Sequence, residues 1–206
     1  MLPMYAQDFS PIIQAITEQG YAISDYFLPA TTILALKRHA EELLQSGHMK
    51  LAGTGLQAEH QAIRGDHVMW IQDDDTTPCI QIYLQQMHAL QQALNQQLFL
   101  NLHELEAHFA AYPIGGRYAK HLDQFNQGRN ALRQVSCVLY LNTDWQEAFG
   151  GQLRMYLPEG KQLDIFPIGG RLVTFMSGEF IHEVLPASHP RVSLTGWFRQ
   201  RDNRFI

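Results

Sequence analysis

His121-Leu122-Asp123 places two metal-ligand side chains two residues apart. In a β-strand, residues at this spacing point to the same face of the sheet. His182 lies in a later stretch that also has strand character and can supply a second imidazole. Two histidines and one carboxylate are the ligand set of non-haem Fe(II) oxygenases, and they leave three coordination positions open. The sequence therefore predicts a metal site at these three residues.

The same spacing also occurs at His39-Ala40-Glu41, within a stretch of helical periodicity. In a helix, side chains two residues apart point about 200° away from each other, so this pair cannot share a ligand. The pattern therefore indicates a metal only when its surroundings are those of a strand. The alternative is that His121 and His182 are ordinary polar residues of a half-buried sheet.

A second feature lies in the run Arg191-Val192-Ser193-Leu194-Thr195, whose alternation is typical of a strand. Arg191, Ser193 and Thr195 then share one face. A guanidinium fork beside two hydroxyl groups is suited to binding a buried carboxylate. A 2-oxo acid could chelate the metal through two open positions and leave the third for dioxygen. The alternative is that Arg191 is solvated.

The first half of the chain has helical periodicity, and the second half has strand character. Helices are predicted over residues 11–19, after a Ser10 cap, and over 31–45 and 79–98. A Gly-rich stretch, 53–65, is predicted as a loop. Short runs rich in β-branched and aromatic residues predict an antiparallel sandwich or barrel; they span residues 107–113, 117–123, 133–142, 151–157, 171–176, 180–186 and 191–199. We expect one domain, 1–206, in which helices pack on a β-sandwich.

The composition argues against two classes of partner, nucleic acids and membranes. Twenty acidic residues against fifteen basic ones give a formal charge of −5, which argues against a nucleic-acid partner. No apolar run approaches the roughly 20 residues needed to span a bilayer, so no membrane association is expected. Cys79 and Cys137 cannot form a disulfide framework, and the N-terminus does not resemble a signal peptide. We expect a cytoplasmic protein.

The sequence resembles the prolyl hydroxylase branch of the Fe(II)/2-oxoglutarate oxygenases, particularly the animal hypoxia-inducible-factor prolyl hydroxylases and their bacterial relatives. The motifs run in order over about residues 63–198. They are Ile63-Arg64-Gly65-Asp66, Trp70-Ile71, Tyr112-Pro113, Tyr118-x-x-His121-x-Asp123, Tyr140-Leu141-Asn142-x-Asp144-Trp145, Gly150-Gly151-x-Leu153-Arg154, Pro158-Glu159-Gly160, Arg171-Leu172, His182-Glu183-Val184-x-Pro186-Ala187 and Arg191-x-x-x-Thr195-x-Trp197.

The resemblance implies a double-stranded β-helix (jelly-roll), an α+β fold with N-terminal helices. Residues 1–105 would form a mainly helical support layer with a mobile loop at 53–66, and 106–206 the dioxygenase core. His121, Asp123 and His182 would be the catalytic iron ligands. Tyr140, Arg191 and Thr195 would bind the distal carboxylate of 2-oxoglutarate, with Tyr112 beside the iron.

The resemblance also implies a reaction. An Fe(II) enzyme of this family uses 2-oxoglutarate and O2 to hydroxylate C4 of a prolyl residue in a protein, and ascorbate keeps the iron ferrous. Arg64, Asp66 and Arg133 would contribute to substrate binding. An ion pair between Asp66 and Arg133 would link the loop to the barrel; the alternative is that both are solvated surface charges. Bacterial relatives suggest translation elongation factor Tu as a candidate substrate with an exposed proline-containing loop.

Two departures weaken the inference about substrate. The turn between Pro113 and Tyr118 is one residue shorter than in the animal enzymes, and the segments before Gly53 match only loosely. The same chemistry on a small molecule or free amino acid stays open, as does a jelly-roll binding module without turnover.

Overall fold

The computed structural model describes residues 7–52, 64–72, 74–124 and 132–201. Three helices lie where the periodicity predicts them: α1 (Ser10–Gln19), α2 (Ala30–Gln45) and α4 (Pro78–Leu98). In α4 the buried side chains include Ile80, Tyr83, Met87, Leu90 and Leu94, which recur every three or four residues and form one apolar face. None of these described helices is long and apolar enough to cross a membrane.

The predicted Ser10 cap is wrong. Ser10 is the first residue of α1, and its backbone N–H donates to the Asp8 carboxylate at 2.9 Å. The N-cap position is Phe9, which makes no side-chain cap hydrogen bond, and Asp8 pairs one backbone N–H that the helix leaves free.

The strands form two antiparallel sheets. The major sheet has the order β1-β9-β6-β11-β4-β3-β2, and the minor sheet has the order β5-β10-β7-β8. The predicted strands correspond to β4 (Leu102–Tyr112), β5 (Tyr118–His121), β6 (Arg133–Tyr140), β7 (Leu153–Tyr156), β9 (Leu172–Met176), β10 (His182–Val184) and β11 (Arg191–Gln200).

The first half contributes strands as well as helices, which the prediction missed. β1 (Tyr21–Ser24) pairs with β9 at one edge of the major sheet, and β2 (Lys50–Leu51) and β3 (His67–Trp70) complete the other edge. β8 (Gln162–Ile165), at the edge of the minor sheet, was also missed. These strands have two to four residues, too few to show alternation. The division into a support layer and a catalytic core stays a prediction.

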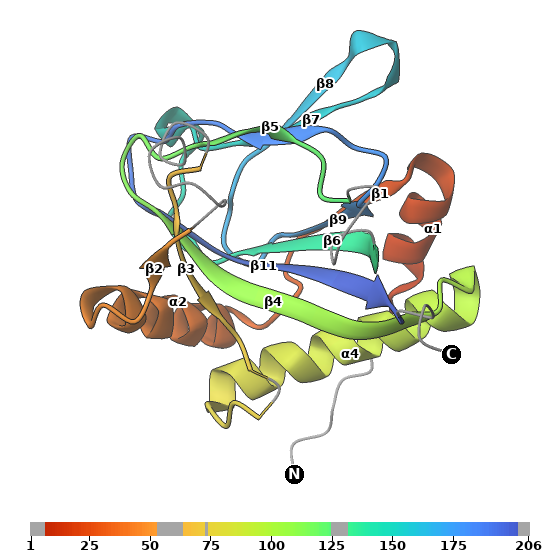
Figure 1. Ribbon diagram of the computed structural model, residues 1–206, viewed down its shortest axis with the longest axis horizontal. Coiled ribbons are helices and arrows are strands. Elements are labelled where there is room, and N and C mark those ends of the chain that lie inside the picture. Colours follow the sequence, from red (N-terminus) through yellow and green to blue (C-terminus); the bar gives the residue numbers. More distant parts are fainter. Residues whose placement is uncertain (1–6, 53–63, 73, 125–131, 202–206) are drawn as a thin grey trace.

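The three helices cover the outer face of the major sheet, and the minor sheet lies over its inner face (Figure 1). Along β11, Val192, Leu194 and Phe198 join the core beneath the helices. The alternate residues Arg191 and Ser193 line a cavity on the inner side. A double-stranded β-helix with N-terminal helices is therefore confirmed, and its strand alternation separates an apolar core from a polar interior.

Candidate metal centre

Strand pairing brings the two histidines together. β5 and β10 are antiparallel neighbours, and His121 lies directly opposite His182 in their register. Asp123 lies between them, with Oδ1 3.4 Å from His121 Nε2 and Oδ2 3.7 Å from His182 Nε2. One ligand atom from each residue lies within 4.8 Å of the others, and among the described residues this is the only such group. His39 and Glu41 on α2 take no part.

Backbone carbonyl groups set the tautomers of both histidines. His121 Nδ1 lies 2.8 Å from the Ala119 carbonyl oxygen, and His182 Nδ1 lies 2.9 Å from that of Phe180. A carbonyl oxygen only accepts, so each Nδ1 carries a hydrogen, and in the neutral ring each Nε2 then has a lone pair for a metal. Burial also lowers the pKa of His182, which favours the neutral form that binds metals.

Asp123 is positioned by a contact that the sequence did not indicate. β5 ends at His121, so strand alternation alone does not place this carboxylate. Instead, the Ser136 hydroxyl on β6 donates to Asp123 Oδ2 at 2.7 Å, and Ser136 also contacts the Ser177 hydroxyl at 2.8 Å. Burial would raise the pKa of Asp123, but the positive charge of the two histidines when they are protonated and the hydrogen bond from Ser136 lower it. The carboxylate is therefore held ionised, as a metal ligand must be.

The opposite end of the same cavity holds Arg191, which is 2% exposed. Its guanidinium carbon lies 4.9 Å from the centre of the Tyr112 ring and 5.2 Å from that of Tyr140. Nε and Nη1 of Arg191, Oη of Tyr140 and Oγ of Ser193 have no hydrogen-bond partner among the described residues. Burial raises the pKa values of both tyrosines, so their hydroxyl groups stay protonated donors. Thr195 lines the cavity on the same face, as predicted.

Comparisons with known proteins agree with this arrangement. The family model of the 2OG-Fe(II) oxygenase superfamily matches residues 107–199. A Pseudomonas putida prolyl-4-hydroxylase of known crystal structure is 42% identical, with a TM-score of 0.86, over 95% of this chain and 100% of that one. This chain belongs to the prolyl hydroxylase family of the 2OG-Fe(II) oxygenases.

Further prolyl hydroxylases are similar over most of their length. One from Trichoplax adhaerens, solved in complex with a hypoxia-inducible-factor oxygen degradation domain peptide, is 29% identical with a TM-score of 0.81, over 92% of this chain and 88% of that chain. The mouse prolyl hydroxylase EGLN3 is 28% identical over 94% of this chain and 84% of its own length. The protein is therefore an Fe(II)- and 2-oxoglutarate-dependent oxygenase, which confirms the predicted class of enzyme.

The cavity of this prolyl hydroxylase fits both groups that the family implies. Two neutral imidazoles and a carboxylate suit Fe(II) and leave open positions for a chelating acid. The unpaired nitrogens of Arg191 suit the distal carboxylate of 2-oxoglutarate, because a buried cation without a partner is otherwise costly.

The predicted ion pair between Asp66 and Arg133 is wrong. Asp66 is fully buried and accepts two hydrogen bonds from Arg64, at 2.6 Å from Nε and 2.9 Å from Nη2. Arg133 pairs with Glu106 at 3.2 Å and stacks on the Trp197 ring at 3.5 Å. Sequence neighbours can form a bidentate pair without closing a long loop, which favours the local pairing. Residues 53–63 of the predicted mobile loop lie outside the described residues.

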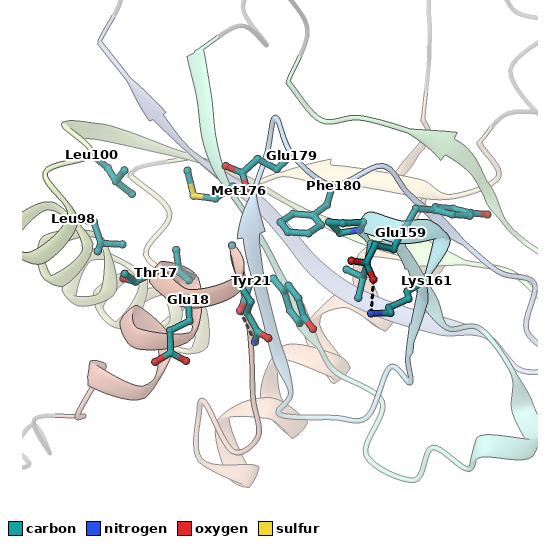
Figure 2. Close-up of a pocket in the computed structure, with 16 residues that line it drawn as sticks. Thr17, Glu18, Tyr21, Leu98, Leu100, Glu159, Lys161, Met176, Glu179 and Phe180 are labelled. Atoms are coloured by element: carbon teal, nitrogen blue, oxygen red, sulfur yellow. Dashed lines mark hydrogen bonds and ion pairs between the residues drawn. The ribbon is translucent and has the colours of Figure 1, made fainter.

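Size alone does not identify the active site of this prolyl hydroxylase. A cavity of about 970 Å³ lies between α1, the end of α4 and the β7–β8 hairpin. Figure 2 shows Tyr21, Met176 and Phe180 lining it, with Glu159 and Lys161 paired at its edge. No described metal-ligand group lies there. The triad lies in a narrower cavity inside the barrel.

Besides Ser136, which holds Asp123, sequence reasoning missed two residues that line the iron-site cavity. They are His108 on β4 and Val138 on β6. Alternation along β4 could have indicated His108, because it is four residues before Tyr112 and so lies on the same face.

Proposed function

We propose that the protein hydroxylates C4 of a prolyl residue in a protein substrate. When bound, Fe(II) with 2-oxoglutarate and O2 supplies an oxidant for a C–H bond, with succinate and CO2 as co-products. The observation that carries the proposal is the pairing, in one buried cavity, of a His-Asp-His triad with an arginine whose Nε and Nη1 have no described partner.

The residues divide into two groups by role. His121, Asp123 and His182 hold Fe(II) on one face. Arg191 receives the distal carboxylate of 2-oxoglutarate, with the hydroxyl groups of Tyr140 and Thr195 beside it and Tyr112 nearer the iron. Five of these residues are buried, which limits the access of water to the reacting centre and strengthens their charge-assisted contacts: Tyr112, Asp123, Tyr140, His182 and Arg191. Ascorbate is the expected reductant that keeps the iron ferrous.

A protein rather than a free amino acid is the proposed substrate. The Trichoplax adhaerens relative was solved with a peptide fragment, and that enzyme is similar over 92% of this chain. Arg64 reaches His108, Arg133 stacks on Trp197, and Asp66 holds Arg64 through two hydrogen bonds. We expect these three residues to contribute to substrate binding. Elongation factor Tu stays a candidate substrate.

We also propose a cytoplasmic location, which the free thiols of Cys79 and Cys137 support.

The proposal is tested by incubating a bacterial protein lysate with Fe(II)-loaded enzyme, with and without 2-oxoglutarate, and mapping hydroxyproline by mass spectrometry. The expected result is 2-oxoglutarate-dependent oxidation at specific prolyl sites, absent with His182→Ala. Succinate formed only with free amino acids or small molecules would favour the alternative substrate class. No succinate with any candidate would favour a binding module.

A separate anaerobic titration measures Fe(II) binding to His182→Ala. His182 is one of three protein ligands, so its removal should abolish tight Fe(II) binding. Unchanged iron affinity would remove His182 from the site. His39→Ala, which changes a histidine of the same spacing pattern on α2, is the matched control and should bind Fe(II) normally.

A further inference from the structure

His108 lies in the catalytic cavity but has no role in the proposed chemistry. It is on β4, directly opposite Thr195 on β11, and only 1% of it is exposed. It lines the same cavity as the three metal-ligand residues and Arg191. A buried histidine on the polar inner face calls for a physical account, because its ring nitrogens need partners.

One nitrogen of His108 is paired, and that contact decides the tautomer. Arg64 Nη2 lies 3.2 Å from His108 Nε2. A guanidinium can only donate, so Nε2 must accept and cannot carry a hydrogen. Burial and the nearby charge of Arg64 lower the pKa of His108 to about 3, so the ring is neutral. Its single hydrogen must then be on Nδ1.

That Nδ1–H has no acceptor among the described residues. The indole Nε1 of Trp197, whose ring stacks on His108 with centroids 5.5 Å apart, also has none. This end of the cavity therefore offers two buried donors and no described acceptor for them. Unpaired buried donors are costly, and an acceptor that enters with a ligand removes the cost.

The His108 ring is held rigidly. Trp70 lies on one side with centroids 4.7 Å apart, and Trp197 lies at 5.5 Å. Arg64 is itself fixed by its two hydrogen bonds to Asp66. A donor held in one orientation binds with little loss of side-chain entropy, which is typical of a recognition group.

The position of His108 favours the protein substrate over 2-oxoglutarate as its acceptor. Tyr112, which faces Arg191 in the register, is four residues along β4 from His108. His108 faces Thr195 and packs against Trp70 and Trp197, whereas the guanidinium of Arg191 lies against Tyr112 and Tyr140. Trp70, which packs against the His108 ring, is 42% exposed, so His108 lies one side chain away from the protein surface.

We propose that His108 is a substrate-binding residue whose Nδ1–H donates a hydrogen bond to a backbone carbonyl oxygen next to the target proline. The inference deepens the proposed function and rests on it. Proline has no N–H, so a peptide around it presents carbonyl oxygens in excess of donors. A fixed donor without an acceptor of its own complements that pattern.

Three substitutions separate this role from packing. Asn places an amide N–H near the position of Nδ1, Gln places its amide near Nε2, and Met fills the space without a donor. The probe is the same bacterial protein lysate at graded dilutions, with KM read at each hydroxylated prolyl site. His108→Met and His108→Gln should raise that KM about five- to thirtyfold, and His108→Asn should have a KM close to that of the wild-type enzyme. The KM for 2-oxoglutarate should change far less.

His103→Met is the matched control, because His103 is exposed on the same strand. A normal KM for His108→Met, with wild-type enzyme active, would overturn the inference and leave the proposed function standing. A wild-type enzyme that hydroxylates no prolyl site would overturn both.

The tautomer can be measured without turnover. In zinc-loaded protein, ¹⁵N shifts of the His108 ring should show a hydrogen on Nδ1 and a lone pair on Nε2. A hydrogen on Nε2 would contradict the inference, whatever the kinetics.

Discussion

Two arginines line the same cavity, and they differ in where their partners come from. Arg64 forms both hydrogen bonds of its fork with the buried carboxylate of Asp66. Burial alone would lower the pKa of Arg64, but Asp66 raises it above the ordinary value. Arg191 is 2% exposed, yet its Nε and Nη1 have no described partner.

Arg64 is therefore neutralised within the folded protein, whereas we expect the partner of Arg191 to arrive with a ligand. A buried guanidinium is costly unless a carboxylate neutralises it. For Arg64 the protein supplies that carboxylate, and for Arg191 we propose that 2-oxoglutarate does. The comparison predicts opposite outcomes when each site is disturbed.

The largest effect is expected at Arg191. Arg191→Lys keeps the charge but removes the fork, and should weaken 2-oxoglutarate binding by about 2 to 5 kcal/mol, while Fe(II) binding persists. Titration of 2-oxoglutarate against the Fe(II)-loaded protein measures the change. Arg154→Lys is the control, because Arg154 holds a similar bidentate contact with Asp164 on the outer β7–β8 hairpin. An unchanged affinity in Arg191→Lys would make Arg191 a structural residue.

At Arg64 the loss should appear in stability. Asp66→Asn leaves the guanidinium without its buried carboxylate, which should lower the free energy of unfolding by about 3 kcal/mol or more. Urea unfolding without 2-oxoglutarate measures it. In the same assay Arg191→Met should be close to neutral, because it removes a charge that lacks a described carboxylate partner. If Asp66→Asn cost no more than Arg191→Met, the two arginines would not differ as proposed.

A smaller effect is expected at Ser136, which donates a hydrogen bond to the metal ligand Asp123. Ser136→Ala removes the hydroxyl that donates to Asp123 and should weaken Fe(II) binding about 10- to 100-fold. Anaerobic Fe(II) titration measures it, with Ser188→Ala as an exposed control. Equal iron affinities would show that the β5–β10 pairing alone positions Asp123.

The smallest effect is expected at Arg171, which pairs with Asp25 at 2.6 Å on the surface. Its hydrogen bonds lower the pKa of Asp25. The contribution to stability is present above the unfolded-state pKa of about 3.9 and is lost as pH falls through the lower folded-state value. Asp25→Asn should cost about 0.2 to 1 kcal/mol at pH 7 and nothing near pH 2. Urea unfolding at both values tests this; an equal cost at pH 2 would contradict an electrostatic origin.

Local periodicity determined much of this protein. Spacings of three and four residues predicted α1, α2 and α4 to within one residue at either end. Alternation along β11 placed Arg191, Ser193 and Thr195 on one face before any partner was known. Both patterns succeed because the period of a helix or strand depends on the backbone within a few residues.

Contacts between distant segments were decided only by the tertiary structure. The strands β1, β2 and β3 are too short to show alternation, and the β5–β10 register sets His121 against His182. The Ser136 hydroxyl donates to Asp123, and Arg64 donates both to Asp66 and to Nε2 of His108. A side chain's type limits what it can bind, but its partner depends on which strands become neighbours. That depends on the burial and hydrogen bonding of the whole barrel, because no short stretch of sequence specifies the register between strands far apart in the chain.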